Sequence, residues 1–69
     1  MMGAIGNHIR RLRFEHGEMT QGALADKIGV TRQTVNAIEQ NKYSPSLETA
    51  FRIAEVFGVG IGEVFNYVA

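Results

Sequence analysis

The chain has 69 residues, which suffices for one small domain with a single modest core. Seven basic and seven acidic residues give a formal net charge of zero, which argues against a polyanion-binding surface spread over the whole molecule. The absence of cysteine excludes disulfides and thiolate metal sites and agrees with a reducing, cytoplasmic location. No apolar run approaches the roughly 20 residues of a membrane span, and the first basic cluster follows the weakly apolar N-terminal stretch, the reverse of a signal peptide.

The charges are unevenly distributed along the chain. Residues 1–42 carry six basic and four acidic side chains, a formal charge of +2. Residues 43–69 carry one basic and three acidic side chains, a formal charge of −2. We therefore expect any contact with a polyanion to be made by one face of the domain, built from the N-terminal part.

The spacing of apolar residues predicts five short helices and no strand, hence an all-α fold in one domain over residues 1–69. The helices are expected at about residues 5–15, 21–28, 32–40, 47–57 and 61–66. Thr20, Thr31 and Ser46 precede three of them and are typical N-cap residues. Gly29 follows the second helix, where glycine tolerates the left-handed conformation that often ends a helix.

Residues 21–40 contain two of these helices joined by the three-residue turn GVT, which has the length and chemistry of a helix-turn-helix. Ala25 lies where the two helices should cross, and its small side chain allows close approach. Val35 and Ile38 mark the buried side of the second helix of the pair. Asn41, after that helix, suits the left-handed conformation of a helix end.

The exposed face of that second helix is rich in amide and guanidinium groups and poor in Glu and Lys. Arg can hydrogen-bond guanine O6 and N7, Gln or Asn can hydrogen-bond adenine N6 and N7, and an Ala methyl can contact a thymine methyl. This pattern predicts a helix that reads base edges in the major groove of double-stranded DNA. The predicted base-reading residues are Arg32, Gln33, Asn36 and Ala37.

The stretch TQGALADKIGVTRQTVNAIEQNKYSPSLETAFRIAEVFGV, residues 20–59, resembles the phage repressor/Cro type of helix-turn-helix regulator, the xenobiotic-response-element family. With IRRLR before it and IGEVF after it, the resemblance covers nearly the whole chain. It implies a compact five-helix, lambda-repressor-like DNA-binding domain. It also implies a sequence-specific transcriptional regulator that acts as a repressor. The sequence itself shows no ligand domain and no catalytic pattern, so no cofactor, no small-molecule ligand and no enzymatic activity is expected.

The resemblance further implies contacts to the DNA backbone. By position, Gln21 would hydrogen-bond a phosphate and brace the reading helix. Other backbone contacts are implied for residues at the start of the reading helix and in the loop after it: Thr31, Thr34, Asn41, Lys42 and Tyr43. Arg10 is also expected near the DNA, whereas we interpret its neighbours Arg11 and Arg13 as a solubilising face.

Other classes of site receive little support from the sequence. His8 and His16 have no third metal ligand at a suitable spacing, so no metal site is predicted. The segment GVGIG follows a helix instead of a strand, which is the wrong context for a nucleotide-binding fingerprint. The alternative function is an antitoxin-like protein-interaction module with secondary DNA binding, although the chain has no extra flexible segment to wrap a toxin.

The C-terminal helix and tail, residues 61–69, end in apolar residues, whereas chain termini are usually polar. One reading helix covers only a few base pairs, so two copies related by a two-fold axis would read half-sites about 34 Å apart in a palindromic operator. We therefore expect a homodimer whose interface includes Phe65, Tyr67 and Val68.

Overall fold

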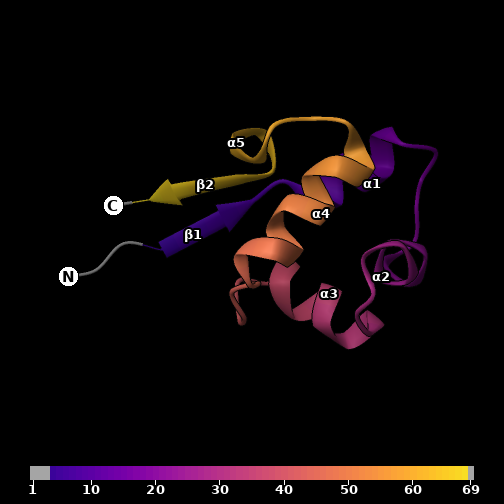
Figure 1. The fold of residues 1–69 in the computed structure, drawn as a ribbon, viewed down its shortest axis with the longest axis horizontal. Coiled ribbons are helices and arrows are strands. Elements are labelled where there is room, and N and C mark those ends of the chain that lie inside the picture. The colour runs from indigo at the N-terminus through magenta and orange to yellow at the C-terminus, as the bar shows by residue number, and fades with distance from the viewer. Residues whose placement is uncertain (1–3, 69) are drawn as a thin grey trace.

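Residues 4–68 are described by a computed structural model, and they form a helical body from which a two-stranded antiparallel sheet projects (Figure 1). The helices are α1 (Ile9–Glu15), α2 (Gln21–Ile28), α3 (Arg32–Glu39), α4 (Leu47–Phe57) and α5 (Ile61–Val64). The strands are β1 (Ala4–Asn7) and β2 (Phe65–Val68). No helix in this part of the chain has the length and apolar character needed to cross a membrane.

Side-chain caps begin three of the helices at the predicted residues. The hydroxyl oxygens of Thr20, Thr31 and Ser46 each accept a hydrogen bond from the backbone N–H three residues later. A cap of this kind contributes about 1 kcal/mol to stability. Gly29 and Gly58 follow α2 and α4 with φ angles of +76° and +67°, a region that a Cβ atom disfavours. The ends of α2 and α4 therefore fall where the sequence predicted them.

The core lies between the helices, and every helix contributes to it (Figure 1). The buried apolar residues of the cluster are Ile9, Leu12, Leu24, Ala25, Ile28, Val35, Ile38, Ile53, Ala54, Phe57 and Val64. Val64 is fully buried, and its carbonyl accepts a hydrogen bond of 2.8 Å from the backbone N–H of His8. This bond ties the short C-terminal helix to the beginning of α1.

The prediction of an all-α fold is wrong at both ends of the chain. Residues expected to begin the first helix form β1, and residues expected to end the fifth helix and continue as a tail form β2. Gly6 weakens a helix in the first segment, and the sequence FNYV, with two aromatic residues and a β-branched one, favours a strand in the second. Helical periodicity misassigned Ile5 because its partner in the sheet, Tyr67, lies at the other end of the chain.

The register of the sheet decides which side chains face the helical body. Ile5 pairs with Tyr67, and Asn7 pairs with Phe65. Directly opposed residues in an antiparallel pair point to the same side, and alternate residues share a face. These four side chains therefore lie on one face. Phe65 packs against the core, whereas Ile5 and Tyr67, farther along the projecting sheet, are exposed.

Ala25 belongs to the buried side of α2 and to the core, with only 2% of its surface exposed. We expect Ala25→Leu to lower the free energy of unfolding by about 1–3 kcal/mol, because added methyl groups overpack a filled core. Chemical denaturation measures this change. The control is Asp26→Leu at the adjacent exposed position, where we expect a change within about 0.5 kcal/mol. An unchanged midpoint for Ala25→Leu would contradict the close helix crossing.

Candidate nucleic-acid interface

Helix α3 buries one side and exposes the other. Val35 and Ile38 are 1% and 2% exposed and hold the helix against the core. The predicted base-reading residues lie on the remaining surface: Arg32, Gln33 and Asn36 are exposed and Ala37 is half-buried. The structure therefore gathers all four on the solvent side of one helix, with the longest side chains near its N-terminus.

Both ends of α3 are closed by local hydrogen bonds. At the start, the Thr31 hydroxyl accepts from the backbone N–H of Thr34 at 3.2 Å and lies 3.0 Å from the Thr34 hydroxyl. At the end, Asn41 adopts a positive φ of +61°, as its residue type predicted. The backbone N–H of Lys42 then donates to Ala37 at 2.9 Å, and that of Asn41 donates to Ile38 at 3.0 Å, the two bonds of a Schellman motif. The exposed side chains of the following loop are thereby held close to the reading helix.

An ion pair between α1 and α3 fixes the flank of the reading helix. Arg13 Nε donates to Glu39 Oε2 at 2.6 Å, and Arg13 Nη2 donates to Glu39 Oε1 at 3.1 Å. Arg13 Nη1 also donates to the carbonyl of Met19 at 2.7 Å. The two side chains are only 15% and 9% exposed. The interpretation of Arg13 as a solubilising residue is therefore wrong.

The positions of Arg13 and Glu39 in the sequence indicate that each charge lies next to a buried side chain. Arg13 follows the buried Ile9 by four residues, and Glu39 follows the buried Val35 by four, so each lies beside an apolar stripe. Two opposite charges at such positions suggest a paired, half-buried contact. Their partnership depends on how α1 and α3 pack, which the spacing within each helix does not specify.

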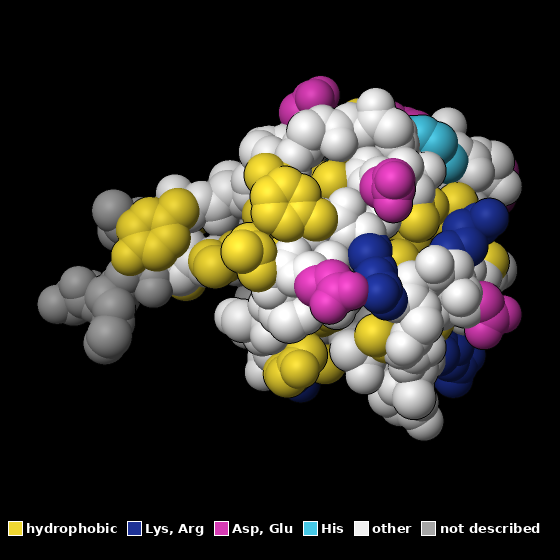
Figure 2. Space-filling model, in the orientation of Figure 1, with side chains coloured by type: hydrophobic (Ala, Val, Ile, Leu, Met, Phe, Trp, Pro, Cys, Tyr) yellow, Lys and Arg dark blue, Asp and Glu magenta, His cyan; other side chains and the backbone are white. Residues whose placement is uncertain are grey.

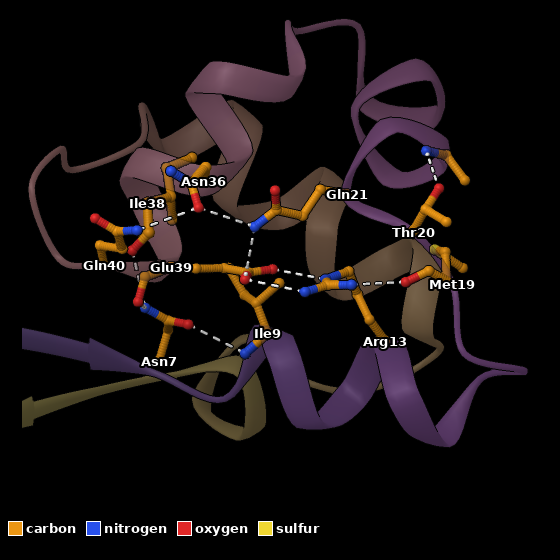
Figure 3. Close-up of polar contacts among 11 residues, drawn as sticks. Asn7, Ile9, Arg13, Met19, Thr20, Gln21, Asn36, Ile38, Glu39 and Gln40 are labelled. Carbon is orange, nitrogen blue, oxygen red and sulfur yellow. Dashed lines mark hydrogen bonds and ion pairs between the residues drawn. The ribbon is translucent and has the colours of Figure 1, made fainter.

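Gln21 connects the ion pair to the exposed face of α3 (Figure 3). Its Nε2 donates to Glu39 Oε1 and to Asn36 Oδ1, both at 3.1 Å. Gln40 Nε2 also donates to Asn36 Oδ1, at 3.3 Å. Both N–H groups of the Gln21 amide are thus directed at protein acceptors, so a phosphate contact through this amide would break one of these bonds.

The same contacts orient the Asn36 amide. Its oxygen accepts two hydrogen bonds from Gln21 and Gln40, which leaves its NH₂ group available to a partner. A bidentate contact with adenine requires the amide oxygen as well as the NH₂ group. In this arrangement Asn36 is suited to donate to an acceptor such as guanine O6 or N7 or thymine O4.

The distribution of ion pairs makes the reading side more cationic than the net charge suggests. Three ion pairs occur within residues 4–68: Arg11–Glu15, Arg13–Glu39 and Arg52–Glu48. In that same range, four cationic side chains pair with no carboxylate: Arg10, Lys27, Arg32 and Lys42. The one acidic residue of α3, Glu39, is neutralised by Arg13. Of these four cations, Arg32 lies on α3, Lys42 lies in the loop after it and Arg10 lines a depression beside it, so a polyanion approaching α3 meets cations whose charge is not already matched.

Arg10 belongs to this side of the molecule. It lines a shallow depression whose other walls are Arg13, Gln21, Asn36, Glu39 and Gln40. The depression joins α1 to α2 and α3, so Arg10 stands near Asn36, one of the predicted base-reading residues, although it lies far from it in the sequence.

The residues predicted to form a dimer interface lie on β2, apart from the exposed face of α3 (Figure 1). Phe65 is half-buried against the core, whereas Tyr67 and Val68 are 69% and 55% exposed. Only the last two therefore present most of their surface to a partner.

The histidines and carboxylates of residues 4–68 include no group of three arranged to hold a metal ion. The His16 side chain instead contacts two backbone carbonyl groups and an aromatic ring. Its Nδ1 lies 2.8 Å from the Leu12 carbonyl oxygen, its Nε2 lies 3.2 Å from that of Phe57, and its ring contacts the Phe57 ring with centroids 5.1 Å apart. These contacts join the end of α1 to the end of α4.

The chain is similar to known helix-turn-helix proteins over most of its length. The helix-turn-helix family model matches residues 9–64. An uncharacterized HTH-type transcriptional regulator of Methanocaldococcus jannaschii is 51% identical over 61 residues, covering 88% of this chain and 91% of the relative. The cryptic phage CTXphi transcriptional repressor RstR of Vibrio cholerae is 41% identical over 58 residues, covering 84% of this chain and 51% of RstR. The crystal structure of a candidate DNA-binding protein from Bacteroides fragilis matches with a TM-score of 0.76 at 26% identity, over 90% of this chain and 98% of that one.

The contribution of the half-buried ion pair between Arg13 and Glu39 to stability can be tested by removing its cation. We expect Arg13→Met to lower the free energy of unfolding by about 3–5 kcal/mol, because Glu39 is then left half-buried without a counter-charge. The control is Arg11→Met, which removes a 3.8 Å contact between exposed side chains and should cost no more than about 1 kcal/mol. Equal, small losses in urea denaturation would show that the Arg13 contact contributes no more than a surface pair.

Proposed function

The chain belongs to the helix-turn-helix family and is a DNA-binding transcriptional regulator, and on that premise we propose that it represses transcription by occupying an operator that α3 reads in the major groove. The proposal is carried by one observation: the four predicted base-reading residues share the exposed face of a helix whose opposite face is buried. Operator occupancy requires binding alone, and the family acts by DNA binding without a catalytic step.

Arg32 and Gln33 are the principal base readers in this proposal. Both are exposed in the first turn of α3, where their side chains can reach two acceptors or a donor–acceptor pair on one base edge. Asn36 contributes its NH₂ group, because its oxygen is held by Gln21 and Gln40. Ala37, with its short side chain, lets the middle of the helix approach the groove closely.

The backbone contacts come from the rim of this face. Lys42 and Tyr43 extend from the loop that the Schellman bonds hold against α3, and Arg10 approaches from α1. The residues Thr31, Thr34 and Asn41 supply hydroxyl and amide groups at the two ends of α3. Gln21 acts mainly by orienting Asn36 and Glu39, since its own N–H groups are engaged. Contacts of this kind position the protein on the duplex, while the base contacts carry the sequence preference.

The test begins with selection of bound duplexes from a random DNA pool. Arg32→Ala and Gln33→Ala should each relax the preference at one or two positions of a half-site, at a cost of about 1–3 kcal/mol for the preferred base. Lys42→Ala is the matched control. It should weaken all duplexes alike and reduce the slope of log affinity against log salt by about one.

Two outcomes contradict parts of the proposal. If no duplex binds even at low salt, operator binding by this chain is refuted. If Arg32→Ala lowers affinity equally for every sequence, Arg32 is a backbone contact and the assignment of the reading face is wrong.

We further propose that two copies bind together, joined through the projecting sheet. The sheet has only two strands in the described chain, so each strand has an outer edge that no other strand of residues 4–68 pairs with. A two-stranded sheet is marginally stable in water, and free edges are templates for pairing with another chain. A second copy would extend the sheet and cover its exposed apolar residues.

The surface around the sheet supports a second copy as the partner. Ile5 and Tyr67 line a groove of about 320 Å³ together with Ser44 and Pro45 of the loop after α3. In Figure 2 hydrophobic side chains occur on the projecting sheet and on the adjoining part of the body. A palindromic operator read by one helix per half-site requires such a symmetric pair.

Truncation after Asn66 should convert the dimer to a monomer, because it removes Tyr67 and Val68 while Phe65 keeps its place against the core. Light scattering at tens of micromolar measures the mass. Phe51→Ser is the control: this aromatic residue is also exposed, at 54%, but lies on α4 beside a different groove, which is lined by Val59 and Ile61. Loss of the dimer in Phe51→Ser alone would place the interface on α4 instead.

A further inference from the structure

The Asn7 side chain links the start of α1, two residues away, to the end of α3 and the loop after it, which lie more than 30 residues along the chain (Figure 3). Its Nδ2 donates to the Ile38 carbonyl at 3.0 Å and to Asn41 Oδ1 at 3.1 Å, with the Glu39 carbonyl a more distant acceptor at 3.4 Å. Its Oδ1 accepts from the backbone N–H of Ile9 at 3.1 Å. One amide at the end of β1 therefore contacts the start of α1, the end of α3 and the loop after α3.

These contacts use both functions of the amide. The last carbonyl groups of a helix have no partner within the helix, and Asn7 supplies a donor to them from another element. The first N–H groups of a helix need an acceptor, which Asn7 supplies to α1 through its oxygen. An Asp side chain lacks the donor, and a Ser side chain is shorter, so neither is expected to make all of these contacts.

The two ends of α3 differ in what fixes them. At the start, the bond to Thr31 joins residues within the first turn of the helix. The Schellman bonds of Asn41 and Lys42 at the other end are also local, but that end has an additional contact from another element. Local bonds move with the helix and do not fix its position in the domain. Asn7 instead holds the end of α3 to β1, and β1 is paired with β2.

We propose that Asn7 is a positioning residue that sets the placement of α3 relative to the projecting sheet. This inference rests on the proposed function, in which α3 reads DNA and the sheet joins two copies. Under that function the Asn7 contacts connect the dimer surface to the reading helix. They thereby help to set the separation and orientation of two reading helices, which must match the spacing of the half-sites.

The experiment compares Asn7→Ser with Ile53→Val. Serine keeps an acceptor for the start of α1 and shortens the donor that reaches α3. Ile53→Val destabilises a fully packed position on α4 without touching the reading face. Affinity is measured for the selected palindromic duplex and for a random-sequence duplex, at a temperature where denaturation curves show both variants fully folded.

We expect Asn7→Ser to lower the ratio of specific to random-duplex affinity by about three- to tenfold, the effect of losing one net hydrogen bond. Its preference for the original half-site spacing over a spacing changed by one base pair should also weaken. Ile53→Val should leave both quantities unchanged. A purely structural role for Asn7 predicts a lower melting temperature with an unchanged ratio, and that result would overturn the inference.

Amide hydrogen exchange rates measured in the DNA-free protein test the positioning role of Asn7 without relying on DNA binding. Asn7→Ser should accelerate exchange at Gln40, Asn41 and Lys42, at the end of α3, more than at Thr34 and Val35, at its start. Ile53→Val should not produce this local difference. If the wild-type protein binds no duplex, the proposed function fails while exchange still decides whether Asn7 holds α3. Equal exchange rates in the wild type and Asn7→Ser would overturn the positioning role.

Discussion

The bidentate contact between Arg13 and Glu39 is the constraint on which the reading surface depends. It joins α1 to α3 through side chains that are 15% and 9% exposed, and the third guanidinium nitrogen, Arg13 Nη1, donates to the Met19 carbonyl. Removing two charges from water is unfavourable and offsets much of their mutual attraction, so such a pair is weak evidence for high stability. The pair does restrict geometry, because Arg13 and Glu39 can neutralise each other only if α3 is oriented with Glu39 facing α1. Together with the burial of Val35 and Ile38, the pair therefore fixes which side of α3 faces outward.

The polar network extends this constraint to the surface. Glu39 accepts from Gln21, and Gln21 orients Asn36, so the amide groups on the exposed face are arranged before any DNA arrives. A side chain that is already ordered loses less conformational entropy when it binds. The arrangement also explains how a neutral chain can contact a polyanion: the carboxylate on the reading helix is neutralised internally, while Arg32 and Lys42 are not paired with a carboxylate in the described part of the chain.

The projecting sheet adds a second level of organisation. Phe65 anchors β2 to the core, and Asn7 anchors β1 to the end of α3, so the sheet is attached to the body near the reading helix. Its outer half, with Ile5 and Tyr67 exposed, lies beyond these anchors. If a second copy extends the sheet, the same residues that hold the sheet in place also relate the two reading helices. The same contacts would then support dimer formation and set how the two reading helices are placed relative to the DNA major groove.

The sequence by itself determined the features that depend on near neighbours. Thr20, Thr31 and Ser46 as caps, the left-handed Gly29 and Asn41, and the buried Val35 and Ile38 follow from local chemistry and helical periodicity, and together they predict the helix-turn-helix. Only the tertiary structure decided the partners that are distant along the chain. The pairing of β1 with β2, the union of Arg13 with Glu39 and the contacts of Asn7 all join residues from different elements. Periodicity indicates that a residue lies at the edge of a buried stripe, but its partner depends on how two elements pack. For the same reason the assignments of Ile5 to a helix and Arg13 to a solubilising face were wrong.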